Sequence, residues 1–256
     1  FIIKANFIEK ILATSLAKLS NFIPEGGIWM NTQRPEWNDA NNALVGNGVS
    51  MVTLYYLNRF FNFFEELLES SSIQEVEVSN EILQFFDKVL ATFDKNKGLL
   101  SSSINNKNKK IILDALGEAG SEFRMQVYNH AFSGRKTKLS FDKLKRFVSL
   151  SKSYLEHSIE ANKRSDNLYH AYNLMTVNND NSVSISYLSE MLEGQVAVLS
   201  SGYLDGKETL NVLNALKESG RSWLAKEIIE NVKKTLDPIR LEGEYDDEDA
   251  KFSASD

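Results

Sequence analysis

Apolar residues recur with a helical period over long stretches of this chain, and no proline interrupts these stretches. The three prolines, Pro24, Pro35 and Pro238, all lie between them. A proline inside a helix removes a backbone hydrogen bond and clashes with the preceding turn, so this distribution is typical of long packed helices. We therefore predict an all-α fold, with helices at residues 3–20, 47–69, 75–94, 108–131, 140–164, 184–201, 206–219 and 221–236.

Charge is distributed unevenly along the chain. The formal net charge is −6, and six acidic residues lie within residues 242–249. We assign residues 241–256 as an acidic tail and residues 1–240 as a single α-helical domain. The rest of the chain is close to neutral and has no basic block, so nucleic acid is not an expected partner. No segment has the roughly 18 uninterrupted apolar residues of a membrane span, so a membrane is not an expected partner either.

Metal and thiol chemistry find no support in the sequence. The chain has no cysteine, which excludes disulfides, thiolate nucleophiles and cysteine-bound metals. His130 and His157 lie in helical patterns without a ligand-type residue at the i+4 position. We expect no metal and no cofactor.

Residues 26–48 form the segment richest in chemistry-bearing side chains. It combines two tryptophans, an arginine, carboxylates and several amides. Tryptophan rings stack on the apolar faces of sugars, while amides and carboxylates bind hydroxyl groups. In the alternative interpretation the segment only caps a helix, through Asp39 or Asn41. The candidate contacts to a polyhydroxylated ligand are Trp29, Arg34, Trp37, Asn38, Asp39 and Asn41.

One motif in this segment resembles a known family. Glu36-Trp37-Asn38-Asp39, followed by a Gly-rich turn and a helix from Val49, is similar to the Asp-Trp-Asn-Asp loop of the cellobiose and chitobiose phosphorylase family, within the six-hairpin glycosidase superfamily. The resemblance implies an (α/α)6 toroid, of which this chain supplies about eight or nine helices. It also implies that Glu36 is the general acid that protonates the glycosidic oxygen. Glu36 replaces the family's aspartate, which keeps the acid and lengthens the side chain by one methylene.

A second block, residues 190–202, resembles a helix near the C-terminal end of such domains, and the whole chain resembles the C-terminal half of large bacterial proteins with this fold. The remainder of a longer parent chain is therefore a candidate partner. Within this block Glu193 follows apolar residues and precedes Gly194, where a half-buried carboxylate would have a raised pKa. Alternatively, Glu193 points to solvent. Gln195 is a further candidate ligand contact.

Two reactions remain open for an enzyme of this kind. Inverting hydrolysis needs a second carboxylate about 6.5–9.5 Å from the acid, for which Glu193 is the first candidate and Asp39 the second. Phosphorolysis needs an anion site instead, and residues 117–124 contain two glycines, Ser121 and Arg124 that could cradle one. The alternative for residues 117–124 is a kink between two helices.

Residues 167–175 and 59–64 are also conspicuous. Tyr169 and His170 could line a sugar subsite or orient a water molecule, or the tyrosines of this stretch could anchor a loop. The aromatic run from Phe60 to Phe64 is predicted to pack between helices.

Taken with the resemblance, these residues predict a carbohydrate-active enzyme that cleaves a glycosidic bond with inversion. Its ligand would be an oligosaccharide or a glycoside. The alternatives are a glycoside phosphorylase that uses inorganic phosphate, and a non-catalytic sugar-binding or structural helical domain.

Overall fold

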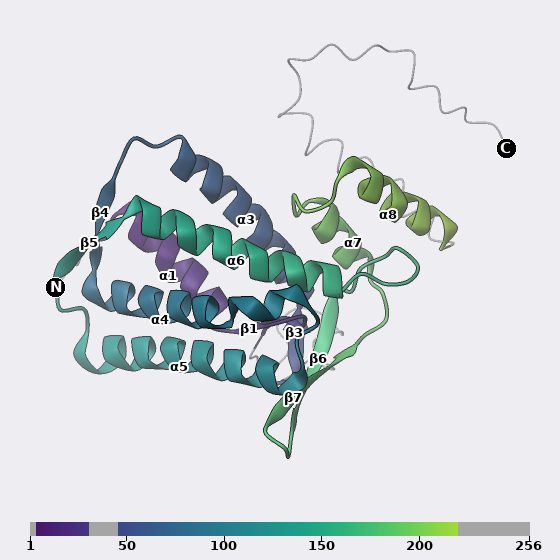
Figure 1. Ribbon diagram of the computed structural model, residues 1–256, viewed down its shortest axis with the longest axis horizontal. Helices are drawn as coiled ribbons and strands as arrows, with labels where there is room; N and C mark the ends of the chain where they lie inside the picture. Colours follow the sequence, from purple (N-terminus) through teal and green to yellow (C-terminus); the bar gives the residue numbers. More distant parts are fainter. Residues whose placement is uncertain (1–3, 31–45, 220–256) are drawn as a thin grey trace, which may run out of the picture. The chain divides into compact units, whose positions relative to one another are not determined.

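The computed structural model describes residues 4–30 and 46–219, which form a mixed α/β structure (Figure 1). The chain divides into two compact units, Phe1–Val212 and Leu213–Asp256. All the elements belong to the first unit except the end of α8. The elements are α1 (Phe7–Leu19), β1 (Phe22–Ile23), β2 (Gly27–Trp29), β3 (Gly48–Ser50), α3 (Met51–Glu69), β4 (Glu75–Ser79), α4 (Asn80–Asn96), a 3-10 helix (Lys97–Ser101), α5 (Asn106–His130), β5 (Lys136–Ser140), α6 (Phe141–Ala161), β6 (Tyr172–Asn178), β7 (Ser182–Tyr187), α7 (Leu192–Leu199) and α8 (Gly206–Glu218).

Two antiparallel sheets lie at opposite ends of the long helices. The larger sheet has five strands in the order β1-β2-β3-β6-β7, and the smaller is a ribbon of β4 and β5. Helices α1, α3, α4, α5 and α6 run between the five-stranded sheet and the ribbon (Figure 1). Serine side chains cap two of the three described helices that follow strands directly: Ser50 accepts from the Thr53 N–H at the start of α3, and Ser140 accepts from the Lys143 N–H at the start of α6.

The predicted all-α toroid is wrong, because the described residues contain these two sheets. Residues 47–50 and 75–79 were predicted as helix, but they contain β3 and β4, and residues 184–187 belong to β7. The segments Glu75–Ser79 and Ser182–Tyr187 alternate polar and apolar residues with the period of a strand. Each pairs with a neighbouring strand that satisfies its backbone hydrogen-bonding groups.

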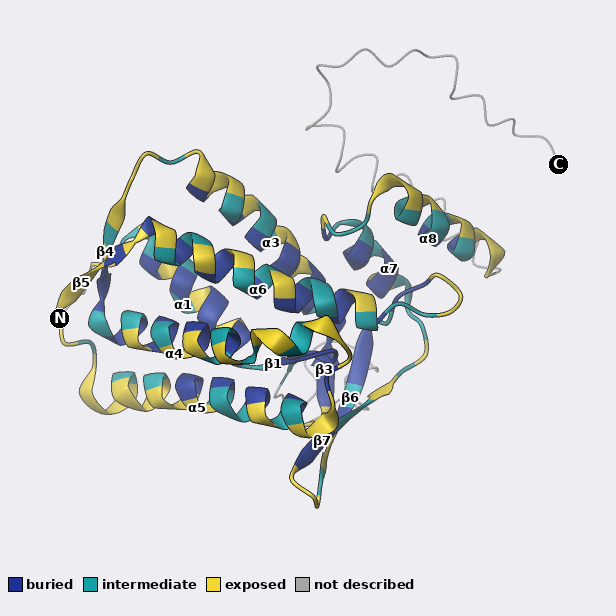
Figure 2. Ribbon diagram, viewed as in Figure 1, coloured by how far each residue is buried: buried dark blue, intermediate teal, exposed yellow. Residues whose placement is uncertain are grey.

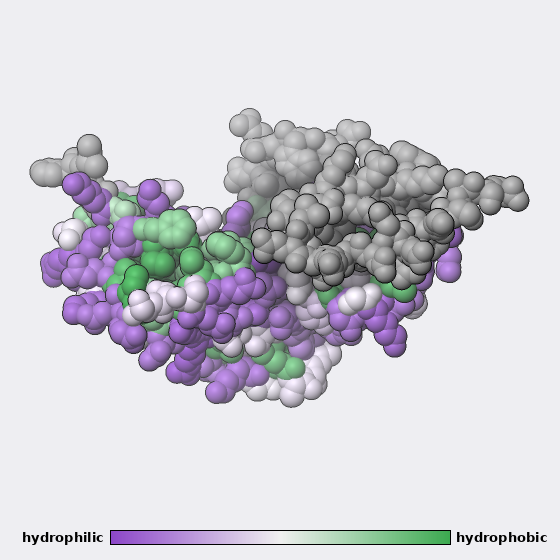
Figure 3. Space-filling model, turned by 90° about the horizontal axis from the view of Figure 1, so that it is seen from above, coloured by the Kyte–Doolittle hydropathy of each residue, from purple (hydrophilic) through white to green (hydrophobic). Residues whose placement is uncertain are grey.

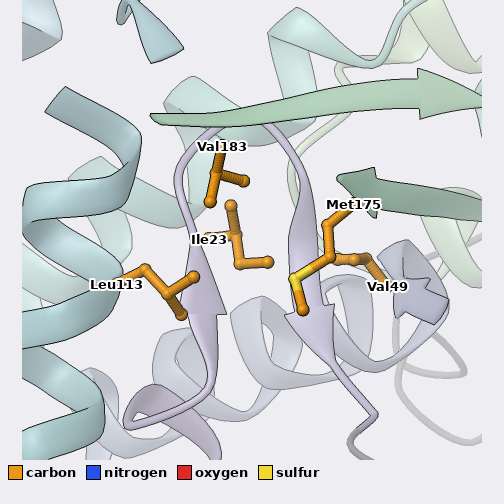
Figure 4. Packing of buried hydrophobic residues seen from close by; sticks show 5 residues of the cluster. All are labelled: Ile23, Val49, Leu113, Met175 and Val183. Atoms are coloured by element: carbon orange, nitrogen blue, oxygen red, sulfur yellow. The ribbon is translucent and has the colours of Figure 1, made fainter. Parts of the chain in front are cut away.

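A hydrophobic cluster joins α5 to one face of the five-stranded sheet (Figure 4). It contains one residue from each of four strands and one from α5: Ile23, Val49, Met175, Val183 and Leu113. Side chains two residues apart on a strand share a face, so this set defines the face of the sheet that α5 covers, which α5 contacts mainly through β1 and β7. Trp29 and Ile185 pack against the cluster while remaining partly exposed.

Aromatic residues form much of the core between the helices, where buried positions follow the inward faces (Figure 2). Phe93 and Tyr154 stack with ring centroids 4.5 Å apart, and Phe22 meets both rings edge-on. The Tyr154 hydroxyl donates to the Phe93 carbonyl at 2.9 Å. Pairing this hydroxyl avoids the cost of burying an unpartnered polar group.

A buried ion pair fixes the turn between β1 and β2. The Glu25 carboxylate accepts from Lys109 Nζ at 2.8 Å and from the Ile104 N–H at 2.7 Å. The Glu25 N–H donates to Ser158 Oγ, and its carbonyl accepts from Asn162 Nδ2, so α5 and α6 both hold this turn. Burial raises the pKa of Glu25, but the hydrogen bonds from Lys109 and Ile104 outweigh it and lower the pKa below its ordinary value.

A second buried carboxylate joins α1 to the ribbon. Glu9 Oε1 accepts from the Ser79 N–H at 2.8 Å and from its hydroxyl, while Oε2 accepts from the Asn6 N–H and from Lys136 Nζ, both at 2.8 Å. Burial alone would raise the pKa of Glu9. The hydrogen bonds from Lys136, Ser79 and Asn6 outweigh burial and lower the pKa to about 2.

Candidate functional site

A groove of about 500 Å³ lies between α5 and the five-stranded sheet, and we call it the α5 groove. The sheet supplies an aromatic and apolar wall, while α5 supplies a charged and polar wall. The end of α1 contributes two small polar residues. The lining residues are Ser20, Asn21, Trp29, Lys110, Leu113, Asp114, Gly117, Glu118, Ser121, Arg124, Met175 and Val177.

Trp29 is held at the groove by the pairing of β2. It lies opposite Val49 on β3, which places it on the face of the sheet that α5 covers. Its indole N–H donates to the Gly46 carbonyl at 2.9 Å, and its backbone N–H donates to the Asn21 carbonyl at 2.7 Å. The two hydrogen bonds therefore hold the ring in one orientation.

Lys110, Asp114 and Glu118 recur every four residues along α5 and so share one face of that helix. Lys110 Nζ lies 2.5 Å from Asp114 Oδ2. Further along, Arg124 donates to the Ser121 hydroxyl at 3.2 Å. This wall therefore presents both carboxylates and hydrogen-bond donors to the groove.

The α5 helix is continuous across residues 117–121, so the kink considered for these residues is absent. Gly120 lets α5 approach α1, since a Cβ there would lie 2.7 Å from the side chain of Ser20. A Cβ at Gly117 would meet no atom within 4 Å, which fits its place on the open groove. Ser121 and Arg124, predicted as part of an anion cradle, thus line the same groove as Trp29.

Six of the predicted site residues lie in residues 31–45, outside the described residues. They are Arg34, Glu36, Trp37, Asn38, Asp39 and Asn41. The residues on either side of this segment are described: the Met30 N–H donates to the Gly48 carbonyl at 3.0 Å, and Trp29 bonds to Gly46 as above. The segment therefore leaves and rejoins the described structure at the Trp29 end of the α5 groove.

Three other predicted residues, Tyr169, His170 and Gln195, do lie close together, but the Gln195 side chain forms hydrogen bonds with the backbone of Tyr169. Gln195 Oε1 accepts from the Tyr169 N–H at 2.9 Å, and its Nε2 donates to the Tyr169 carbonyl at 2.7 Å. Gly194 permits this contact, because a Cβ there would lie 2.9 Å from Ala171 Cα. Gln195 thus joins α7 to the strand-like segment before β6, and its polar atoms are paired within the chain.

The His170 ring stacks on Tyr187 with a centroid distance of 4.2 Å. Burial lowers the pKa of His170, and the nearby positive charge of Arg164 lowers it further, so both favour the neutral form of the ring. Its Nδ1 is buried and has no hydrogen-bond partner among the described residues. Arg164 forms a two-pronged ion pair with Asp166.

Glu193 is exposed in the first turn of α7, and it hydrogen-bonds to Tyr172. Burial raises the pKa of Tyr172, and the neighbouring Glu193 raises it further. Tyr172 and Met175 are three residues apart on β6, so their side chains point to opposite faces of the sheet. Because Met175 lines the α5 groove, Glu193 and Trp29 lie on different faces and do not form one site.

Sequence reasoning missed Lys110, Asp114 and Glu118. Their spacing of four residues within a helical pattern is a visible signal, but only the position of the sheet shows that this face borders Trp29. Among the described residues, no three His, Asp or Glu side chains come together in a way that could hold a metal ion. Within residues 4–30 and 46–219, no helix combines the length and the apolar character needed to cross a bilayer. The chain matches no protein-family model and no curated protein.

Proposed function

We propose that the α5 groove binds a carbohydrate or a closely related polyhydroxylated ligand. The observation that carries this proposal is the position of a fixed, partly exposed tryptophan, Trp29, opposite a helix face with two carboxylates, Asp114 and Glu118. The ring offers a flat apolar surface to the C–H face of a sugar. The carboxylates, together with Asn21, offer acceptors and donors for hydroxyl groups.

The size of the α5 groove suits such a ligand. Its volume of about 500 Å³ lies within the range of roughly 300–1,000 Å³ that is common for small-molecule sites. Lys110 and Arg124 balance the charges of the two carboxylates, so these four lining residues give the groove no net charge.

The binding proposal is tested by titrating the chain with cellobiose, chitobiose and maltose in a calorimeter. We expect at least one to bind, and we expect Trp29→Ala to weaken that binding about five- to tenfold, since loss of a stacking surface removes about 1–1.5 kcal/mol. Asp114→Asn should weaken binding severalfold through the lost hydroxyl contacts. Glu69→Gln, an exposed carboxylate at the end of α3, is the matched control and should leave the affinity unchanged. Binding that survives Trp29→Ala unchanged would rule out this groove.

A second candidate function is cleavage of the bound glycoside with Glu36 as the general acid. One observation favours it: residues 31–45, which contain Glu36, are joined to the structure at the Trp29 end of the groove. The role of Glu36 itself comes from the motif alone, because the toroid implied by the resemblance is absent. Glu193 lies on the other face of the sheet, so a base for hydrolysis in this groove would have to come from Asp114, Glu118 or the 31–45 segment.

Release of p-nitrophenol from aryl β-glucosides and β-N-acetylglucosaminides, with and without inorganic phosphate, tests this second function. We expect activity that Glu36→Gln lowers at least tenfold, because the amide cannot protonate a leaving group. A requirement for phosphate identifies phosphorolysis, and its absence identifies hydrolysis. Sugar binding without turnover in the wild-type chain would restrict the function to binding.

A further inference from the structure

We propose that a groove between α1 and α3 binds an amphipathic helix of a partner protein, and that this helix carries acidic residues beside its apolar stripe. The two helices pack on different neighbours, α1 on α4 and α3 on α6. They face each other across two hollows, of about 460 and 300 Å³, which together we call the α1–α3 groove. This groove is separate from the α5 groove, so the proposal does not depend on sugar binding.

The α3 side of the groove carries an exposed apolar stripe, of which Tyr56 and Phe60 line one hollow and Leu67 lines the other. Tyr56, Phe60, Phe63 and Leu67 follow one another at spacings of four, three and four residues, which places them on one side of the helix. Phe63 is 57% exposed, Tyr56 46% and Leu67 37%. The aromatic run was predicted to pack between helices, and Phe61 and Phe64 do so, but Phe63 does not.

The wall formed by α1 continues this apolar surface. Phe7 is 64% exposed at the start of α1, and Ile8 and Ile11 line the two hollows. The face of the molecule seen from above in Figure 3 carries a green, apolar area in the region of α3. An exposed apolar surface of this continuity is characteristic of an interaction site rather than of ordinary protein surface.

The length of the groove fits a helix. From Tyr56 to Leu67 the stripe covers twelve residues of α3, and its two ends lie about 16 Å apart at 1.5 Å per residue, which is three helical turns. A helix lying in a groove is typically held by apolar anchors at positions i, i+3 or i+4, and i+7. The two hollows, one beside Phe60 and one beside Leu67, can each take such an anchor.

The charged residues beside the groove indicate which kind of partner helix would bind. The only charged residues that line either hollow are Lys10 and Lys18, and neither has an ion-pair partner among the described residues. They lie eight residues apart on α1, about 12 Å along its axis. A partner helix with acidic residues two turns apart beside its apolar stripe would face both lysines, and electrostatic complementarity of this kind gives specificity.

The test uses two synthetic peptides of about 20 residues with the same leucine stripe. One peptide has glutamates beside the stripe and the other has lysines at the same positions. Fluorescence anisotropy with the full chain should show at least tenfold tighter binding of the glutamate peptide. This advantage should shrink as salt is raised, because ions screen exposed charges.

Three variants locate the binding site. Phe63→Glu should lower the affinity for the glutamate peptide at least tenfold. The double variant Lys10→Glu/Lys18→Glu should bind the lysine peptide more tightly than the glutamate peptide. Tyr128→Glu, which replaces a 79% exposed aromatic residue on α5, is the matched control and should leave the affinity for both peptides unchanged. Near-UV circular dichroism checks that each variant is folded. If Phe63→Glu does not fold, the double variant Lys10→Glu/Lys18→Glu still tests the proposal through the change in peptide preference.

Other outcomes would overturn the proposal. Equal affinity for the two peptides, or binding that Phe63→Glu leaves unchanged, would contradict it. A dimer in sedimentation velocity that Phe63→Glu dissociates would make a second copy of this chain the occupant. Binding to phosphatidylserine-containing vesicles, lost in Phe63→Glu and without peptide binding, would instead identify a lipid surface.

Discussion

Replacing Glu25 with glutamine is expected to lower the free energy of unfolding by about 3–5 kcal/mol, because it leaves the buried Lys109 ammonium without a countercharge. Glu25 and Lys109 are both buried, and the carboxylate also accepts from the Ile104 N–H. Urea denaturation of the wild type and the variant at pH 7 measures this difference.

Two comparisons make the Glu25 result specific. The double variant Glu25→Gln/Lys109→Met should recover part of the loss, since it removes the buried charge as well as its partner. Glu122→Gln, which breaks the exposed pair between Lys88 and Glu122, should cost no more than about 1 kcal/mol. A loss below 1 kcal/mol in Glu25→Gln itself would mean that water reaches Lys109.

Acid should remove a stabilising contribution of about 3 kcal/mol that comes from Glu9. The folded-state pKa of Glu9 is about 2, below its ordinary value of 4.5, because hydrogen bonds from Lys136, Ser79 and Asn6 favour the ionised form despite burial. A group with a lowered folded pKa binds its proton more readily in the unfolded chain. Its contribution is therefore complete above pH 4.5 and is lost as the pH falls toward 2.

Urea denaturation at a series of pH values between 7 and 2 measures the Glu9 contribution. Glu9→Gln should be less stable than the wild type at pH 7, and the difference should shrink as the pH falls below 4.5. Glu69→Gln changes an exposed carboxylate, and its stability should follow the wild type throughout. A constant difference between wild type and Glu9→Gln at all pH values would show that Glu9 acts through packing rather than charge.

Most of the long helices could be predicted from the sequence, and the sheets could not. Apolar residues at helical spacing mark the regions of α3, α4, α5 and α6, since α3, α4 and α6 bury one face along most of their length and α5 does so as far as Gly120. The strands have only two to seven residues, so the alternation of polar and apolar residues that β4 and β7 show is brief, and the strands adjoin helices without a proline between them. Their partners are also remote: Gly48 pairs with Leu174, and Glu75 pairs with Ser140.

In the candidate site, too, residues that stand out in their own segment could be predicted, and residues brought together only by the packing of distant segments could not. Trp29 was predicted as a ligand contact from its residue type and its polar surroundings, and the structure places it on a groove. Asp114 and Glu118 were not predicted, because their proximity to Trp29 depends on how α5 lies on the sheet. Gln195 was predicted as a ligand contact, but its carboxamide pairs with the N–H and the carbonyl of Tyr169. It thus takes the place of a neighbouring strand.

The strand order of the five-stranded sheet also determines when its parts can assemble during synthesis. Strands β1, β2 and β3 are complete by residue 50, but β6, which lies beside β3, begins only at residue 172. A ribosome must therefore translate more than a hundred further residues before β3 gains its second neighbour. In that interval α4 and α5 can form from nearby residues, and the β4–β5 ribbon can pair once residue 140 has been made. The cluster that contains Val49 and Leu113 is completed only when Met175 and Val183 have been made. The late arrival of the β6–β7 hairpin makes it the step that completes this sheet, and a nascent chain stalled before it would expose the apolar face that α5 shares with the sheet.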